Sequence, residues 1–88
     1  MGYMHRMVTV LRAHGLRVVI FINDHRPAHV HVFGDGEAKI NLSGPDGAPE
    51  VVWADNMSRG EVRRALRLVI EQQVLLLARW RELHERTD

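Results

Sequence analysis

Residues 29–42 read HVHVFGDGEAKINL, two alternating runs joined by an Asp-Gly pair at Asp35 and Gly36. Alternation with period two is the pattern of a β-strand, and Asp-Gly between two such runs is a strong signal for a hairpin turn. The stretch therefore predicts two antiparallel strands, at about 29–33 and 37–42. Their pairing decides which face of the sheet the histidines occupy, because a shift of one residue turns every side chain over.

Two registers are compatible with this hairpin. A two-residue loop, Asp35 and Gly36, would set His31 opposite Ile40 and turn both strand histidines to the apolar face. A three-residue loop, with Gly36 in the left-handed conformation, sets His31 opposite Lys39 instead. We favour the second register because it separates apolar from polar side chains.

The segments on either side of the hairpin complete the fold. Apolar runs predict further strands, and a periodic apolar pattern predicts a helix, with Ser58 as its N-cap and Glu61 completing a capping box. The expected elements are strands at about 7–12, 16–22 and 50–53 and a helix at about 59–86. With 88 residues, the chain is expected to be one α+β domain, residues 1–88, in which a small antiparallel β-sheet of four to five strands packs against one long C-terminal helix.

The predicted helix carries more apolar surface than one small sheet needs. Its core-facing stripe, spaced at three and four residues, comprises Val62, Ala65, Leu66, Val69, Ile70, Gln73, Leu76, Leu77, Trp80 and Leu83. Leu68, Leu75 and Ala78 fall outside the stripe and widen the apolar surface, so we expect a homodimer or a partner protein. Pro27 cannot donate a strand hydrogen bond, which indicates a free side of the third strand nearby.

Composition limits the classes of function. The chain has no cysteine, which excludes thiolate metal sites and leaves His, Asp and Glu as ligands. A net charge of +1 does not demand an anionic partner. The apolar run 16–22 is too short to span a bilayer, and the start of the chain lacks the apolar stretch of a signal peptide, so we expect a cytoplasmic protein with no membrane partner. Both tryptophans, Trp53 and Trp80, are expected in the core.

Three of the six histidines lie within seven residues, at His25, His29 and His31. Strand alternation points the last two to one face, and imidazole is both a transition-metal ligand and a proton carrier. One hypothesis is a divalent transition metal held by His29, His31 and Asp24. A second is acid–base catalysis by the same two histidines, with His25 assisting and Glu37 or Asp24 orienting an imidazole. The alternative is two half-exposed strand histidines that make ordinary hydrogen bonds.

A basic patch is expected on the first half of the helix, formed by Arg59, Arg63, Arg64 and Arg67. Guanidinium groups suit phosphate contacts, so nucleic acid or an acidic partner is a candidate ligand here. The alternative is a solvated helix face, because glutamates along the same helix supply the opposite charge.

Three segments carry a resemblance to a known family: DHRPAHVHV at 24–32, GDGEAKINL at 34–42 and LLLARW at 75–80. They resemble the small bacterial proteins of the domain of unknown function 4160 (DUF4160) family, from Thr9 to Trp80. Members typically show Asn-Asp-His, proline, His-x-His and then Glu-Ala, which here are Asn23, Asp24, His25, Pro27, His29, His31, Glu37 and Ala38. Ala28 departs from the pattern, because a second proline is common there. The resemblance implies a compact α+β domain whose site consists of these polar residues.

The resemblance also implies a cellular context, because members resemble components of two-gene operons suspected to be toxin-antitoxin systems. We therefore expect a component of a toxin-antitoxin-like pair that binds a small cognate protein from the same operon. The alternative is a metal-dependent or histidine-based hydrolase, such as a ribonuclease, that uses His29 and His31. A further alternative is binding of operator DNA or RNA through the arginine-rich helix face.

Overall fold

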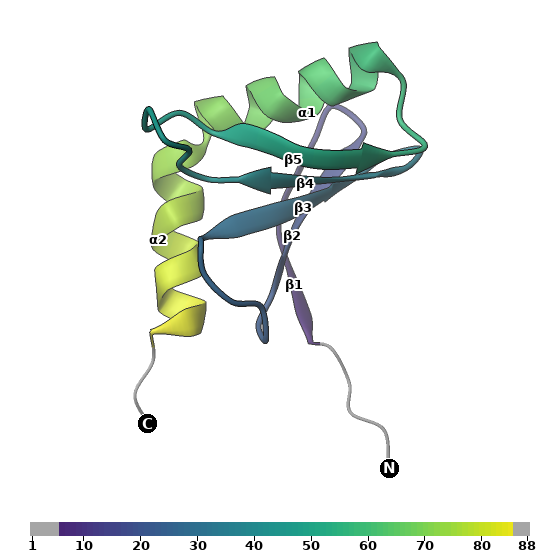
Figure 1. The fold of residues 1–88 in the computed structure, drawn as a ribbon. Coiled ribbons are helices and arrows are strands. Elements are labelled where there is room, and N and C mark those ends of the chain that lie inside the picture. Colours follow the sequence, from purple (N-terminus) through teal and green to yellow (C-terminus); the bar gives the residue numbers. More distant parts are fainter. Residues whose placement is uncertain (1–5, 86–88) are drawn as a thin grey trace.

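The computed structural model of the chain describes residues 6–85. Five strands form one antiparallel sheet in the order β1-β2-β3-β4-β5, so each strand pairs with its neighbours in sequence (Figure 1). The elements are β1 (Met7–Ala13), β2 (Leu16–Phe21), β3 (His29–Phe33), β4 (Glu37–Asn41), β5 (Glu50–Asp55), α1 (Arg59–Glu71) and α2 (Gln73–His84). The predicted α+β class and antiparallel sheet are confirmed. Residue 86, where the predicted helix ends, lies outside the described residues.

The first hairpin turns in two residues. His14 and Gly15 both have positive φ, of 56° and 75°, as a type I′ turn requires. The turn closes β1 onto β2 so that Arg12 and Arg17 lie directly opposite each other.

The β3–β4 hairpin has the three-residue loop that the sequence favours. Val30 pairs with Ile40 and His31 with Lys39, so apolar and polar side chains are separated onto the two faces of the sheet. This register is confirmed, and it places both histidines on the face opposite the core side chains Val30, Val32 and Ile40.

The two glycines of this loop are needed for close packing rather than for the backbone angles of a turn. The left-handed conformation expected at Gly36 is wrong, because its φ is not positive. A Cβ at Gly36 would instead collide with the backbone oxygen of Asp55 at the end of β5, and one at Gly34 would collide with the carboxylate of Glu61. Only glycine leaves room for both neighbours.

The first turn of α1 forms half of the predicted capping box. Ser58 Oγ accepts a hydrogen bond from the backbone N–H of Glu61, at 3.1 Å, as an N-cap does. The Glu61 side chain does not complete the box. Its Oε2 accepts from the backbone N–H of Asp35, at 2.8 Å, because the β3–β4 loop packs against the start of the helix.

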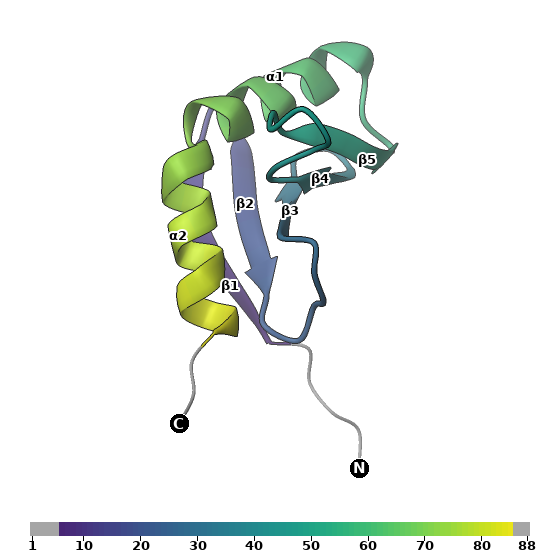
Figure 2. The same ribbon diagram turned by 60° about the vertical axis from the view of Figure 1, so that its left-hand side comes forward.

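The single long helix is wrong: α1 and α2 meet at Gln72, whose φ and ψ are −109° and 19°. A straight helix over residues 59–84 would be about 39 Å long, roughly twice the width of a five-stranded sheet. The bend lets α1 cross the sheet by β4 and β5 while α2 runs beside β1 and β2 (Figure 1, Figure 2). Gln73 fixes this bend, because its Nε2 donates to the carbonyl oxygens of Leu42 and Gly47 at 2.7 and 2.8 Å.

The core lies between the helices and one face of the sheet. Its buried side chains are Leu16, Val18, Ile20, Val30, Val32, Ala38, Ile40, Leu42, Ala65, Leu68, Val69, Leu76 and Trp80. The bend changes which helix positions face the sheet, so Leu68, predicted outside the stripe, is buried, and Ile70, predicted within it, is half exposed. Trp80 is in the core as expected. Trp53 is not, because β5 turns it to the other face, where it is 40% exposed.

The free strand side expected near Pro27 is wrong for β3, which is the middle strand and pairs with both β2 and β4. The β2–β3 ladder is short, however, and joins only residues 17–19 to 31–33. Within the described chain the edge strands are β1 and β5.

Neither helix between residues 6 and 85 combines the length and apolar character needed to cross a membrane.

Candidate metal centre

The site lies on the sheet face that the helices do not cover. Val30 and Val32 of β3 point into the core, so His29 and His31, which alternate with them, point to the opposite face. The β2–β3 ladder ends at His31, and from there the chain that joins the two strands is free to fold back over the histidines.

The β2–β3 loop places Asp24 beside the histidines. Its backbone N–H donates to the Phe21 carbonyl oxygen at 3.2 Å, which turns the chain directly after β2. Further along the loop, Arg26 and Glu85 form an exposed ion pair at 2.7 Å that ties the loop to the end of α2. The Arg26–Pro27 peptide bond is cis. The loop is held at its start by the turn at Asp24 and in its middle by the Arg26–Glu85 pair.

Both ring nitrogens of His29 face oxygen acceptors. The ring is only 5% exposed, Nδ1–H donates to the Pro27 carbonyl oxygen at 2.8 Å, and Nε2 lies 2.7 Å from Asp24 Oδ2. A neutral imidazole has only one N–H, and His29 uses it in the hydrogen bond to the Pro27 carbonyl oxygen. The Nε2 lone pair therefore faces the Asp24 carboxylate. That contact is favourable when a proton or a metal cation lies between the two atoms.

His31 repeats this arrangement. Its Nδ1 lies 2.8 Å from Glu37 Oε2, and its Nε2 lies 3.5 Å from the same Asp24 Oδ2. The ring is mostly buried, with the edge of Phe21 at 4.7 Å and Trp53 at 6.0 Å between ring centroids. Two imidazoles thus converge on one carboxylate oxygen within partly apolar walls.

The three side chains fit a transition-metal site. One atom of each of Asp24, His29 and His31 lies within 4.8 Å of the other two. Ligand atoms of a tetrahedral ion at about 2.1 Å are about 3.4 Å apart, so the His31–Asp24 distance of 3.5 Å already suits an ion. The 2.7 Å His29–Asp24 contact has to lengthen by less than about 1 Å. The oxygen atoms that hold each Nδ1 are the partners that metal-bound histidines usually have.

The remaining predicted residues of this cluster have different positions. Glu37 contacts His31 but is not among the three convergent ligands. His25 is exposed and lines a cavity of about 270 Å³ over the site, together with Lys39 and Trp53. The description of both histidines as half exposed is wrong: Asp24 and the loop cover His29, and the His31 side chain is only 13% exposed.

The arginine patch is not part of this site. Arg59, Arg63, Arg64 and Arg67 are all exposed on α1, which packs on the other side of the sheet from the histidines. Arg64 and Arg67 line a small cavity with His14 and Glu71. Glu71 therefore places a negative charge beside these arginines, as expected for a solvated helix face.

Sequence reasoning missed Lys39 and Trp53 as neighbours of the site. The hairpin register could have found Lys39, because it is the cross-strand partner of His31. Trp53 is in turn the β5 partner of Lys39, but a bulge between β4 and β5 sets that pairing, and the sequence does not show where the bulge lies.

The comparisons with known proteins agree with the sequence resemblance. A family model described as "Domain of unknown function (DUF4160)" matches residues 15–81, a range that includes Asp24, His29, His31 and Glu37. No curated protein and no solved structure matches the chain.

Proposed function

Because the chain belongs to the DUF4160 family of domains of unknown function, we propose its function from the site itself: a metal-dependent hydrolase in which Asp24, His29 and His31 hold a divalent transition metal. The observation that carries the proposal is the convergence of two Nε2 atoms on one carboxylate oxygen. Each Nδ1 is meanwhile engaged by another oxygen atom. Both lone pairs are thereby directed at the same point.

The ligand number suits hydrolysis. A divalent ion with three protein ligands keeps positions for water and substrate, and it supplies a Lewis acid and a water molecule activated near neutral pH. Glu37 and the Pro27 carbonyl group orient the two imidazoles. Lys39 and His25 line the cavity over the ligands and favour a substrate with negatively charged oxygen atoms, such as a phosphodiester.

Elemental analysis of protein purified without chelators tests the metal site. We expect about one zinc, iron, manganese or nickel per chain in the parent and none in the His29→Ala/His31→Ala variant. His25→Ala is the matched control, because His25 lies in the same cavity outside the ligand group and should leave the metal content unchanged. A parent without metal, or equal metal content in parent and double variant, contradicts the proposal.

Hydrolytic activity is a separate measurement. We expect the metal-loaded parent to cleave a chromogenic phosphodiester, EDTA to abolish the activity, and the double variant to lack it. A metal-loaded parent that cleaves no ester would contradict the hydrolase proposal and leave only the proposal that the protein binds a metal.

A second candidate function is binding of a small cognate protein in the cytoplasm, as one member of a toxin-antitoxin-like pair. Exposed apolar side chains around the α1–α2 bend support it: Ile70 and Leu75 are about half exposed and Val74 is 83% exposed. Such a patch on a small domain favours a partner or a homodimer. Co-purification with the protein encoded beside it should be lost in Val74→Asp, and size-exclusion chromatography of the isolated chain distinguishes a homodimer from a monomer.

A further inference from the structure

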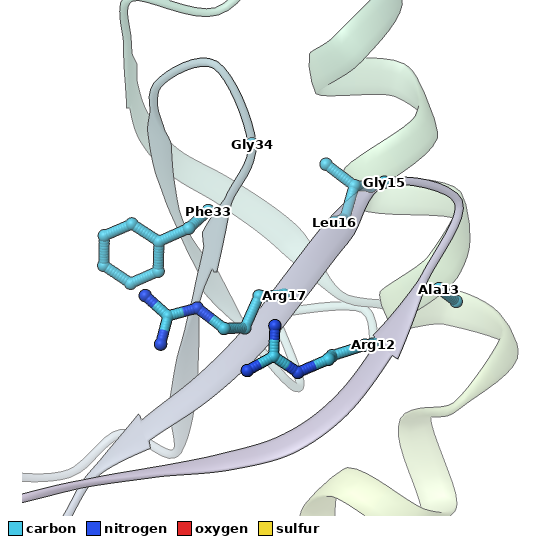
Figure 3. A pocket seen from close by; sticks show the side chains of 7 residues that line it. All are labelled: Arg12, Ala13, Gly15, Leu16, Arg17, Phe33 and Gly34. Atoms are coloured by element: carbon cyan, nitrogen blue, oxygen red, sulfur yellow. The ribbon is translucent and has the colours of Figure 1, made fainter.

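A second pocket lies at the turn end of the β1–β2 hairpin, with a volume of about 570 Å³. Figure 3 shows Arg12, Arg17 and Phe33 among the side chains that line it. Phe33 is two residues from His31 on β3 and therefore points to the same face of the sheet. Arg17 is the cross-strand partner of Phe33. The pocket and the candidate metal centre thus share one sheet face, and Phe33 follows His31 by about 7 Å along β3.

Two positive charges oppose each other in this pocket. Arg12 and Arg17 are direct partners across the β1–β2 ladder, and like charges in this arrangement repel. None of the ion pairs among residues 6–85 involves either of them. A bound anion between the two guanidinium groups would relieve the repulsion and accept hydrogen bonds from both.

An aromatic ring lies beside this charge pair. The Arg17 guanidinium carbon is 5.1 Å from the centroid of the Phe33 ring, and Figure 3 shows the Arg17 side chain extending toward the ring. Positive charge next to an accessible aromatic ring is the combination that binds single strands, because the cations hold a phosphate group while a base stacks on the ring.

The charges of the other side chains in the cross-strand row of Arg12, Arg17 and Phe33 restrict where the phosphate groups of a bound strand can lie. Beyond Phe33, the same cross-strand row continues to Glu37 and Asp55, both negatively charged. Phosphate groups are therefore favoured over β1 and β2, at Arg12 and Arg17, and disfavoured over β4 and β5.

We propose that this pocket binds a phosphodiester of a single-stranded nucleic acid, with one base against Phe33 and the adjoining nucleotide directed toward Asp24, His29 and His31. The assignment of this strand as a substrate rests on the proposed function, because it names the substrate class of the proposed hydrolase. The binding itself needs no metal. It also moves the expected nucleic-acid surface from the helix arginines to the open sheet face.

Fluorescence anisotropy with a labelled oligonucleotide of about ten nucleotides, at about 50 mM salt, tests the proposal. Arg12→Gln/Arg17→Gln should weaken binding at least about tenfold, because two charge-assisted hydrogen bonds are lost. Arg63→Gln/Arg64→Gln removes the same charge from α1 and should leave affinity within about twofold. Phe33→Leu keeps apolar bulk without the ring and should weaken binding about fivefold. RNA and DNA strands of the same sequence decide which sugar is preferred.

Three results would overturn the proposal: no binding of either strand by the parent, unchanged binding by the Arg12/Arg17 variant, or an equal loss in the helix control. The titrations are done in EDTA and again with metal, on parent and on His29→Ala/His31→Ala. Binding by the parent in EDTA reports the Arg12–Arg17 site alone, and we expect Arg12→Gln/Arg17→Gln to lose strand affinity while it keeps the parent's metal content. A failed nucleic-acid site is then distinguishable from a failed metal site.

Discussion

The two faces of this sheet are built by alternate residues of the same strands, and they differ in what covers them. On one face Val30, Val32 and Ile40 have no solvent exposure beneath α1 and α2. On the other, His31 and Lys39 alternate with these residues, and a loop rather than a helix covers His29. One strand pair therefore has two separable roles. Substitutions on the covered face should change stability, and those on the open face should change metal and ligand binding.

The largest effect is expected on the covered face. Ile40→Ala should lower the free energy of unfolding by about 3 kcal/mol, because it leaves a cavity in a packed core. Trp53→Ala, on the open face, should cost about 1 kcal/mol or less. Urea denaturation of the two variants measures both values. Equal costs would break the distinction between the faces.

Metal should stabilise the protein from the open face. At a free concentration about one hundred times the Kd, a bound ion adds about 2.7 kcal/mol to the free energy of unfolding. EDTA should remove this increment from the parent and change nothing in His29→Ala/His31→Ala. Thermal unfolding with and without the ion measures it, and stabilisation of the double variant by the same amount would place the ion elsewhere.

Glu37 should affect the metal without affecting the core. Glu37→Ala removes the acceptor that holds His31 Nδ1 and should lower metal affinity about 10- to 100-fold. Glu37→Gln keeps an oxygen acceptor and should lose less. Calorimetric titration of both variants checks the order, and an unchanged affinity in Glu37→Ala would show that the contact is incidental.

The smallest effect is expected at the exposed Arg26–Glu85 ion pair. Arg26→Ala should change the free energy of unfolding by less than about 1 kcal/mol and metal affinity by less than about threefold. The turn at Asp24 and the hydrogen bond to Pro27 remain without it. A large loss of metal affinity would mean that α2 holds the site in place.

Much of the sheet could be predicted from the sequence, because it depends on local patterns. Alternation in residues 29–42 gives the strands, and separating Val30 from His31 onto opposite faces gives the register. The pairing of His29 and His31 on one face follows from the same alternation. The role of Gly36 was mistaken, because it is set by the approach of Asp55, which is distant in sequence.

The parts that could not be predicted depend on tertiary contacts. No proline or glycine interrupts the apolar period at Gln72, so the sequence does not indicate the bend. The bend depends on the hydrogen bonds of Gln73 to Leu42 and Gly47, which are distant in sequence. Predicting that Arg12 lies opposite Arg17 requires the length of the hairpin turn, and predicting the position of Trp53 requires the location of the bulge between β4 and β5. Asp24 was a candidate by its residue type, but only the folded loop brings its carboxylate to both imidazoles.

An anomalous-difference map from crystals of the metal-loaded protein, collected at the absorption edge of the ion, would locate the metal. We expect one peak about 2.0 to 2.2 Å from Nε2 of His29, Nε2 of His31 and a carboxylate oxygen of Asp24. A peak elsewhere, or none at this site, would contradict the proposed metal centre.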